Sequence, residues 1–178
     1  MNISKRSSSH QKVMDVRTLT KIAIMASIQS VVFTIFSQIL YLEGITFTVC
    51  LFACAFKRNE AIFASLIFGM VNMLIQGINI WTMMYVVIYP TYSLIVSVLK
   101  PILLKRLGFM VFICGLLSFA TGQLLDLPFI LLSKEVTLFY IILGLKTSLI
   151  QGCLSAFMCL LIFEPCLKVL NKIQGEMK

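Results

Sequence analysis

Nearly all charged residues of this chain fall in a few short segments between long apolar stretches, and this pattern most restricts how the chain can fold. Of 178 residues, 60% are hydrophobic and 12% are charged, with a mean hydropathy of +1.00. A soluble domain is nearer to half apolar and a quarter charged. Because a helix needs about 20 apolar residues to cross the bilayer core, we predict an all-α integral membrane protein.

The apolar stretches predict a bundle of six transmembrane helices, which cover residues 19–40, 44–56, 60–75, 80–99, 108–125 and 136–163. The second is so short that it could be tilted, re-entrant or extended outward through Tyr41. These helices form a membrane domain over residues 19–166. A basic tail, residues 1–18, precedes it and is typical of the leader of a retained helix rather than of a cleaved signal peptide. Residues 167–178 form a second tail.

The positive charges predict the topology of this bundle. Thirteen of them precede the first helix, follow the sixth, or lie in the second and fourth connections: Lys5, Arg6, Lys12, Arg17, Lys21, Lys57, Arg58, Lys100, Lys105, Arg106, Lys168, Lys172 and Lys178. The opposite side has only Lys134. The positive-inside rule then places both termini in the cytoplasm. The net charge of +8 thus reflects topology and does not indicate nucleic acid binding.

Lys146 lies inside the last apolar stretch, in the segment GLKTSLIQG (residues 144–152). A lysine at such depth costs roughly 2.5–3.5 kcal/mol on insertion scales and is a functional-site hypothesis by default. Three interpretations are open. Lys146 contacts a ligand, it pairs with Asp126, or its long side chain reaches the interface without a partner.

Other polar and aromatic side chains gather in the outer halves of the predicted helices, whereas the inner halves are apolar. This asymmetry indicates a ligand pocket that opens to the outside. Its candidate residues are Lys146, Gln151, Asp126, Trp81, Tyr85, Gln76, Asn79, Tyr140 and Gln123, with Tyr41 and Glu43 in a nearby connection. For Trp81 and the tyrosines the alternative is an interfacial aromatic belt, and for Asp126 it is a helix cap in water.

Small residues at helical spacing predict close helix packing in the membrane. They form two stripes, Gly144, Ser148, Gly152 and Ala156 in the sixth predicted helix and Gly115, Ser118 and Gly122 in the fifth. The six cysteines have no CxxC spacing and no histidine pair beside them. We therefore interpret them as packing residues and expect no metal site.

The sequence contains no GxxxxGK[ST] phosphate loop, no HExxH motif and no Ser/His/Asp set. We expect a binding protein rather than an enzyme, with no cofactor, that takes the energy for transport from a partner.

The stretch LTKIAIMASIQSVVF (residues 19–33), together with chain size, six predicted helices and the basic tail, resembles the S components of energy-coupling factor (ECF) vitamin transporters. S components are the substrate-binding membrane subunits of these prokaryotic importers. The resemblance implies an S component in the cell membrane that captures a vitamin or precursor from outside. It also implies a transmembrane T component and two ATPase subunits as partners. The T component would dock on small residues of the first helix: Ala23, Ala26, Ser27 and Ser30.

Stretches such as YLEGITFTVCLFA (residues 41–53) resemble S components whose substrate is less well defined. A cobalamin-type ligand is slightly favoured, and pyridoxine-like and pyrimidine-like vitamins stay open. Two other functions remain as alternatives. The chain could be a stand-alone small membrane transporter or channel, or a membrane assembly protein without a ligand.

Overall fold

The computed structural model describes residues 15–39, 42–131 and 133–176. Within these ranges 89% of the residues are helical, and none is in a strand. The elements are α1 (Val16–Phe36), α2 (Ile45–Ala55), α3 (Arg58–Gln76), α4 (Ile80–Leu103), α5 (Leu107–Leu124), the short 3-10 helix η1 (Leu127–Leu131) and α6 (Lys134–Glu176). Most of the predicted N-terminal tail and Tyr41 lie outside the described residues. The predicted all-α class is confirmed.

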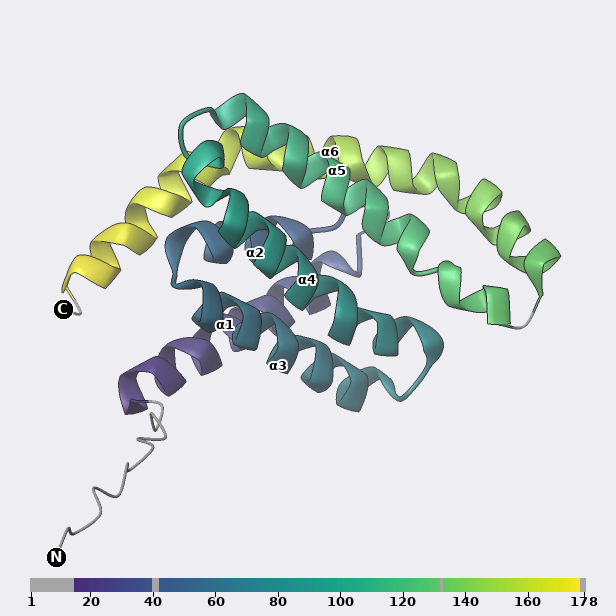
Figure 1. Cartoon of the computed structure of the whole chain (residues 1–178), viewed down its shortest axis with the longest axis horizontal. Helices are drawn as coiled ribbons and strands as arrows, with labels where there is room; N and C mark the ends of the chain where they lie inside the picture. The colour runs from purple at the N-terminus through teal and green to yellow at the C-terminus, as the bar shows by residue number, and fades with distance from the viewer. Residues whose placement is uncertain (1–14, 40–41, 132, 177–178) are drawn as a thin grey trace, which may run out of the picture.

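The helices form two antiparallel pairs with α2 between them. Figure 1 shows α5 and α6 side by side above α3 and α4, while α1 packs along α3. Helix α2 contacts every other long helix of the described chain. The N-terminal end of α1 and the C-terminal end of α6 lie at the same end of the molecule (Figure 1).

Helix α2 lies within one residue of its predicted bounds at each end, but it is buried inside the bundle. It has 11 residues, every one of them buried, so it extends only about 16 Å at 1.5 Å per residue. The bilayer core is about 30 Å thick, and α2 alone is too short to cross it. A helix that is apolar on all sides belongs in the interior of a bundle. Five other helices of the described chain are long and apolar enough to span a membrane.

Helix α6 is longer than the sequence suggests, because it continues through Pro165 to Glu176. A proline inside a helix removes one backbone hydrogen bond and bends the helix, and Figure 1 shows the C-terminal part of α6 turning away from α5. There Leu167 and Leu170 pack against a buried cluster that includes Phe52 and Phe56. Residues 167–176, predicted as a tail, are therefore part of the fold.

The C-terminal end of α2 is held by side chains from two other helices. Gln174 Nε2 in α6 donates to the carbonyl oxygen of Ala55 at 3.0 Å, and Lys100 Nζ in α4 donates to that of Phe56 at 3.4 Å. The last carbonyls of a helix have no partner inside it, and in a buried helix they need one. These bonds fix the end of α2 beside the basic ends of α4 and α6.

Candidate ligand-binding site

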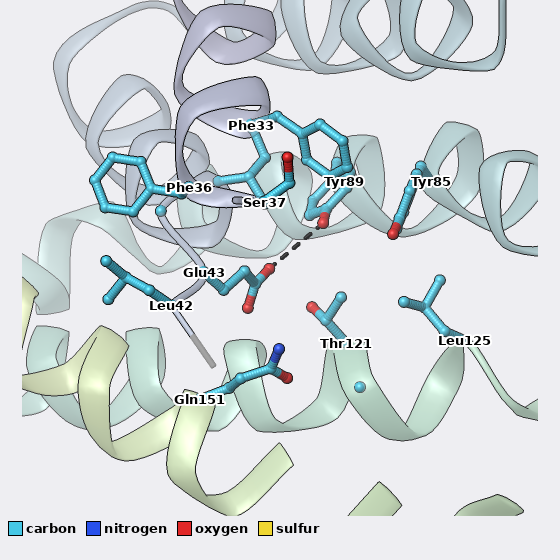
Figure 2. Close-up of a pocket in the computed structure, with 13 residues that line it drawn as sticks. Phe33, Phe36, Ser37, Leu42, Glu43, Tyr85, Tyr89, Thr121, Leu125 and Gln151 are labelled. Carbon is cyan, nitrogen blue, oxygen red and sulfur yellow. Dashed lines mark hydrogen bonds between the residues drawn. The ribbon is translucent and has the colours of Figure 1, made fainter. Parts of the chain in front are cut away.

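A cavity of about 190 Å³ lies where the end of α1 and its connection to α2 meet α4, α5 and α6 (Figure 2). It is lined by Phe33, Phe36, Ser37, Leu42, Glu43, Gly44, Ile45, Tyr85, Tyr89, Thr121, Gly122, Leu125 and Gln151. Of these side chains, Glu43 is the only acid, and none is a lysine, arginine or histidine. The cavity thus combines aromatic walls with one carboxylate.

The backbone at Gly44 brings Glu43 into this position. A Cβ at residue 44 would lie 3.0 Å from side-chain atoms of both Phe36 and Val32. The glycine therefore lets the connection pass close against the last turns of α1. Helix α2 starts at the next residue, which places the Glu43 side chain between α2, α4 and α5.

The Glu43 side chain is the centre of a hydrogen-bond network that joins four elements. Its carboxylate accepts from Thr46 Oγ1 in α2 at 2.6 Å, from the Tyr89 hydroxyl in α4 at 3.4 Å (dashed in Figure 2) and from Ser118 Oγ in α5. Ser155 Oγ in α6 lies 3.0 Å from the Glu43 carbonyl oxygen and 2.9 Å from Ser118 Oγ. The network orients the carboxylate and closes the inner side of the cavity.

Burial raises the pKa of the Glu43 carboxyl above its usual value, while hydrogen bonds from Ser118, Thr46 and Tyr89 act in the opposite direction. Removal from water disfavours the charged form of a carboxylic acid. A positive charge inside the cavity would reverse this effect, because it would favour the ionised form.

Aromatic rings form the wall of the cavity on the side of α1 and α4. Phe33 and Tyr85 meet edge to face with ring centroids 5.6 Å apart, and the centroids of Tyr85 and Tyr89 are 5.4 Å apart. Figure 2 shows these rings on one side of Glu43 and the Gln151 amide on the other. Such a wall provides a large apolar contact surface for a flat or compact ligand.

Of the candidate residues named from the sequence, the structure places Tyr85 and Gln151 in the cavity, together with Glu43 from the nearby connection. Three others, Trp81, Asp126 and Tyr140, form a separate cluster around Phe129 of η1. Ring centroids there are 5.7 Å apart for Trp81 and Phe129 and 5.0 Å apart for Phe129 and Tyr140. The Trp81 side chain also interacts favourably with the Asp126 carboxylate. This cluster holds the α5–α6 connection against the start of α4.

The remaining candidates lie away from the cavity. Gln123 donates to Ser148 Oγ at 2.8 Å between α5 and α6, and Asn79 caps the first turn of α4. Gln76 is exposed at the end of α3, and Lys146 is exposed on the outer side of α6. Asp126 is turned toward Trp81 and Gly144, so the structure does not bring it together with Lys146 as a pair.

The sequence reasoning missed the role of Glu43 with Ser118 and Ser155. A signal was present, because Glu43 is the only charge between two apolar helices, and a carboxylate at such a position is costly unless it is buried with donors. The sequence predicts only a helix-packing role for Ser118. Its hydroxyl in fact combines close packing with a hydrogen bond to the carboxylate.

The predicted docking residues of α1 fall on two faces. Ala23 and Ser27 are exposed, whereas Ala26 is buried and Ser30 is half-buried. Ser27 Oγ donates to the Ala23 carbonyl oxygen at 2.9 Å. Its hydroxyl is thus satisfied within the helix, and the exposed face stays compatible with an apolar environment.

No known family model, no curated protein and no solved structure matches this chain. The geometry of the cavity and the arrangement of the helices are therefore the features that indicate its function.

Proposed function

We propose that this chain is the substrate-binding membrane subunit of an importer of the ECF type. The observation that carries the proposal is a cavity with one oriented carboxylate and aromatic walls inside a bundle of apolar helices. Ligand sites in proteins are typically apolar concavities with a few placed polar groups. Such a cavity suits capture of a small molecule rather than a chemical reaction.

The position of the cavity supports uptake from the outside. Phe33 lies 16 residues after Arg17 on α1, which corresponds to about 24 Å along the helix axis. The basic end of the molecule faces the cytoplasm under the positive-inside rule. In this topology the cavity belongs to the outer half of the membrane. The short α2 and the connection before it return the chain to the basic end, and both termini are cytoplasmic.

The exposed face of α1 supports a membrane partner. Ala23 and Ser27 leave a shallow surface between exposed large side chains, which are Ile24, Ile28, Val31 and Ile35. Small residues permit close approach of another helix in a bilayer. We assign this face to a T component, which would connect the chain to two ATPase subunits.

The cavity volume favours a small ligand among the vitamins considered. A volume of about 190 Å³ corresponds to roughly six water molecules at 30 Å³ each. It lies below the roughly 300–1,000 Å³ typical of sites for drug-sized ligands. A cobalamin-type molecule is far larger than this volume. A pyridine- or pyrimidine-sized ligand therefore replaces it as the favoured substrate.

A second candidate function is a membrane assembly protein without a ligand. The observation in its favour is that the Glu43 carboxylate already accepts hydrogen bonds from three side chains. In that case the network serves only to hold the α1–α2 connection in place.

Purification in a mild detergent, followed by mass spectrometry, tests the proposal. We expect a vitamin-like small molecule and ATPase subunits to accompany the protein. The Tyr85→Leu variant should lose the small molecule, whereas Lys146→Leu, which changes a residue outside the cavity, should retain it. A folded protein that carries no small molecule, binds no vitamin from a panel and has no ATPase partner would refute the proposal in favour of the assembly function.

A further inference from the structure

We propose that the cavity binds a small organic cation, with the positively charged nitrogen of the ligand beside the Glu43 carboxylate. The binding claim rests on the cavity itself, and its role in uptake rests on the proposed function. Three independent features of the cavity support it: the charge of its lining, its aromatic rings and a free amide at the far side.

The only charge that the lining of the cavity can carry is negative. Glu43 is the only residue in the lining of the cavity whose side chain can be charged near neutral pH. Lys146, which stands five residues before the cavity residue Gln151 on α6, is exposed on the outside of that helix. A carboxylate buried without a positive partner is costly. An ammonium group from a ligand would supply that partner, whereas an anionic ligand would be repelled.

The aromatic rings suit the same kind of ligand. Phe33, Phe36, Tyr85 and Tyr89 all line the cavity (Figure 2). The face of an aromatic ring attracts a cation that lies within about 6 Å of its centroid, and quaternary ammonium groups are commonly held in this way. Aromatic rings beside one carboxylate therefore favour a cationic nitrogen over a neutral apolar group.

The far side of the cavity offers hydrogen bonds without charge. Gln151 is half-buried and lines the cavity. Its amide makes no hydrogen bond with any other residue that the structure describes. An amide can donate and accept, so it can bind a hydroxyl or ring nitrogen at the other end of the ligand. The expected ligand thus has a cationic nitrogen at one end and a neutral polar group at the other.

The test compares cations with neutral analogues of the same shape, using the purified full-length protein in detergent and isothermal titration calorimetry. The pairs are choline with 3,3-dimethylbutan-1-ol, and pyridoxamine with pyridoxine. We expect at least one cation to bind 10-fold or more tightly than its neutral analogue. This difference is about 1.4 kcal/mol of binding free energy, which is on the order of one charge-assisted hydrogen bond. Glu43→Gln, which keeps an oxygen acceptor for the three hydroxyls, should remove this preference.

A second variant keeps the test valid if Glu43→Gln does not fold. Phe36→Leu retains an apolar side chain but removes one ring, and it should weaken cation binding by roughly 2- to 30-fold while leaving the neutral analogue unaffected. Leu42→Met, which changes a cavity residue without altering charge or aromatic content, is the matched control.

The outcomes separate this inference from the proposed function. Equal binding of cations and neutral analogues, or no binding of either cation, overturns the inference. A neutral or anionic vitamin that co-purifies with the protein and ATPase subunits also overturns it, while the proposed function stands. Cation binding that depends on Glu43, in a protein without ATPase partners, supports the inference and overturns the proposed function.

Discussion

The substitution Gly152→Ala tests a close backbone contact between α5 and α6. Helices α5 and α6 meet where Gly152 faces Gly115. A Cβ at residue 152 would lie 2.9 Å from the carbonyl oxygen of Gly115 and 3.1 Å from Phe119 Cβ. The first neighbour is a backbone atom of a regular helix, which cannot rotate away as a flexible side chain would. We therefore expect the two helices to separate by a few tenths of an ångström.

Two opposite effects determine the size of the change in stability. Replacing a helical glycine by alanine favours the helix by about 0.5–1 kcal/mol. Forcing one extra carbon into a tightly packed contact costs about 1–3 kcal/mol. With the middle of each range, the net loss in the free energy of unfolding is about 1 kcal/mol. For a chain of this size, that lowers the midpoint of thermal unfolding by roughly 2–4 °C.

Thermal unfolding in detergent, followed with a thiol-reactive dye, measures this change because four cysteines are buried and react only after unfolding. The matched control is Gly108→Ala, since a Cβ at residue 108 meets no atom within 4 Å. The control should be as stable as the original protein or slightly more stable. If Gly152→Ala unfolds at the same temperature as Gly108→Ala, α5 and α6 do not approach as closely as described.

Three further predictions concern side chains around the site. Lys146→Leu should leave ligand binding within about 2-fold of the original, because Lys146 is exposed and outside the cavity; a larger loss in a titration would return this lysine to the site. Cys153 should react with a lipid-soluble maleimide before the four buried cysteines do, as mass spectrometry of partly labelled protein would show. Cation affinity should fall as the pH falls through the pKa of Glu43, because only the ionised carboxylate attracts the cation. Burial raises that pKa, so the fall should begin at a higher pH than for an exposed glutamate. The nearby Tyr85 and Tyr89 hydroxyls stay protonated over this range, and Glu43→Gln should show a flat profile in the same titrations.

The long apolar helices were predictable because hydropathy and length alone identify them. The starts of α3, α4 and α5 lie within two residues of their predicted positions. The two small-residue stripes also face each other as the packing interpretation requires, with a Cβ at Gly115 only 3.0 Å from Ala156 Cβ. Both features depend on local sequence, since glycine and serine at intervals of four produce a flat surface whatever the neighbouring helix is.

Helix α2 and the end of α6 were not predictable in the same way. An apolar run of about a dozen residues is consistent with a tilted span or with an internal helix, and periodicity does not separate the two. The continuation of α6 past Pro165 depends on Gln174 reaching Ala55. That contact joins residues that are 119 positions apart in the sequence, so no local sequence pattern predicts it.

Helix geometry explains why Lys146 lies outside the cavity although it is deep in an apolar stretch. Residues two apart on an α-helix point about 200° away from each other at 3.6 residues per turn. Lys146 is two residues from both Gly144 and Ser148, which face α5, so it must point away from that helix. On the outer side its long chain can carry the ammonium toward the interface. Gln151, three residues after Ser148, returns toward the interior and lines the cavity.

One helix joins the two parts of the proposed function. The last turns of α1 carry Phe33 and Phe36 into the cavity, while Ala23 and Ser27 on the same helix lie on the exposed face that we propose for docking. A helix of 21 residues moves largely as a rigid rod over this distance, so a partner that shifts α1 also shifts one aromatic wall of the cavity. Binding energy at the docking face can then open the ligand site only if the partner binds the displaced position of α1 more tightly than the resting one. The ligand, held between α1 and the Glu43 network, favours the resting position for the same reason. Ligand binding and partner docking should therefore weaken each other by equal factors.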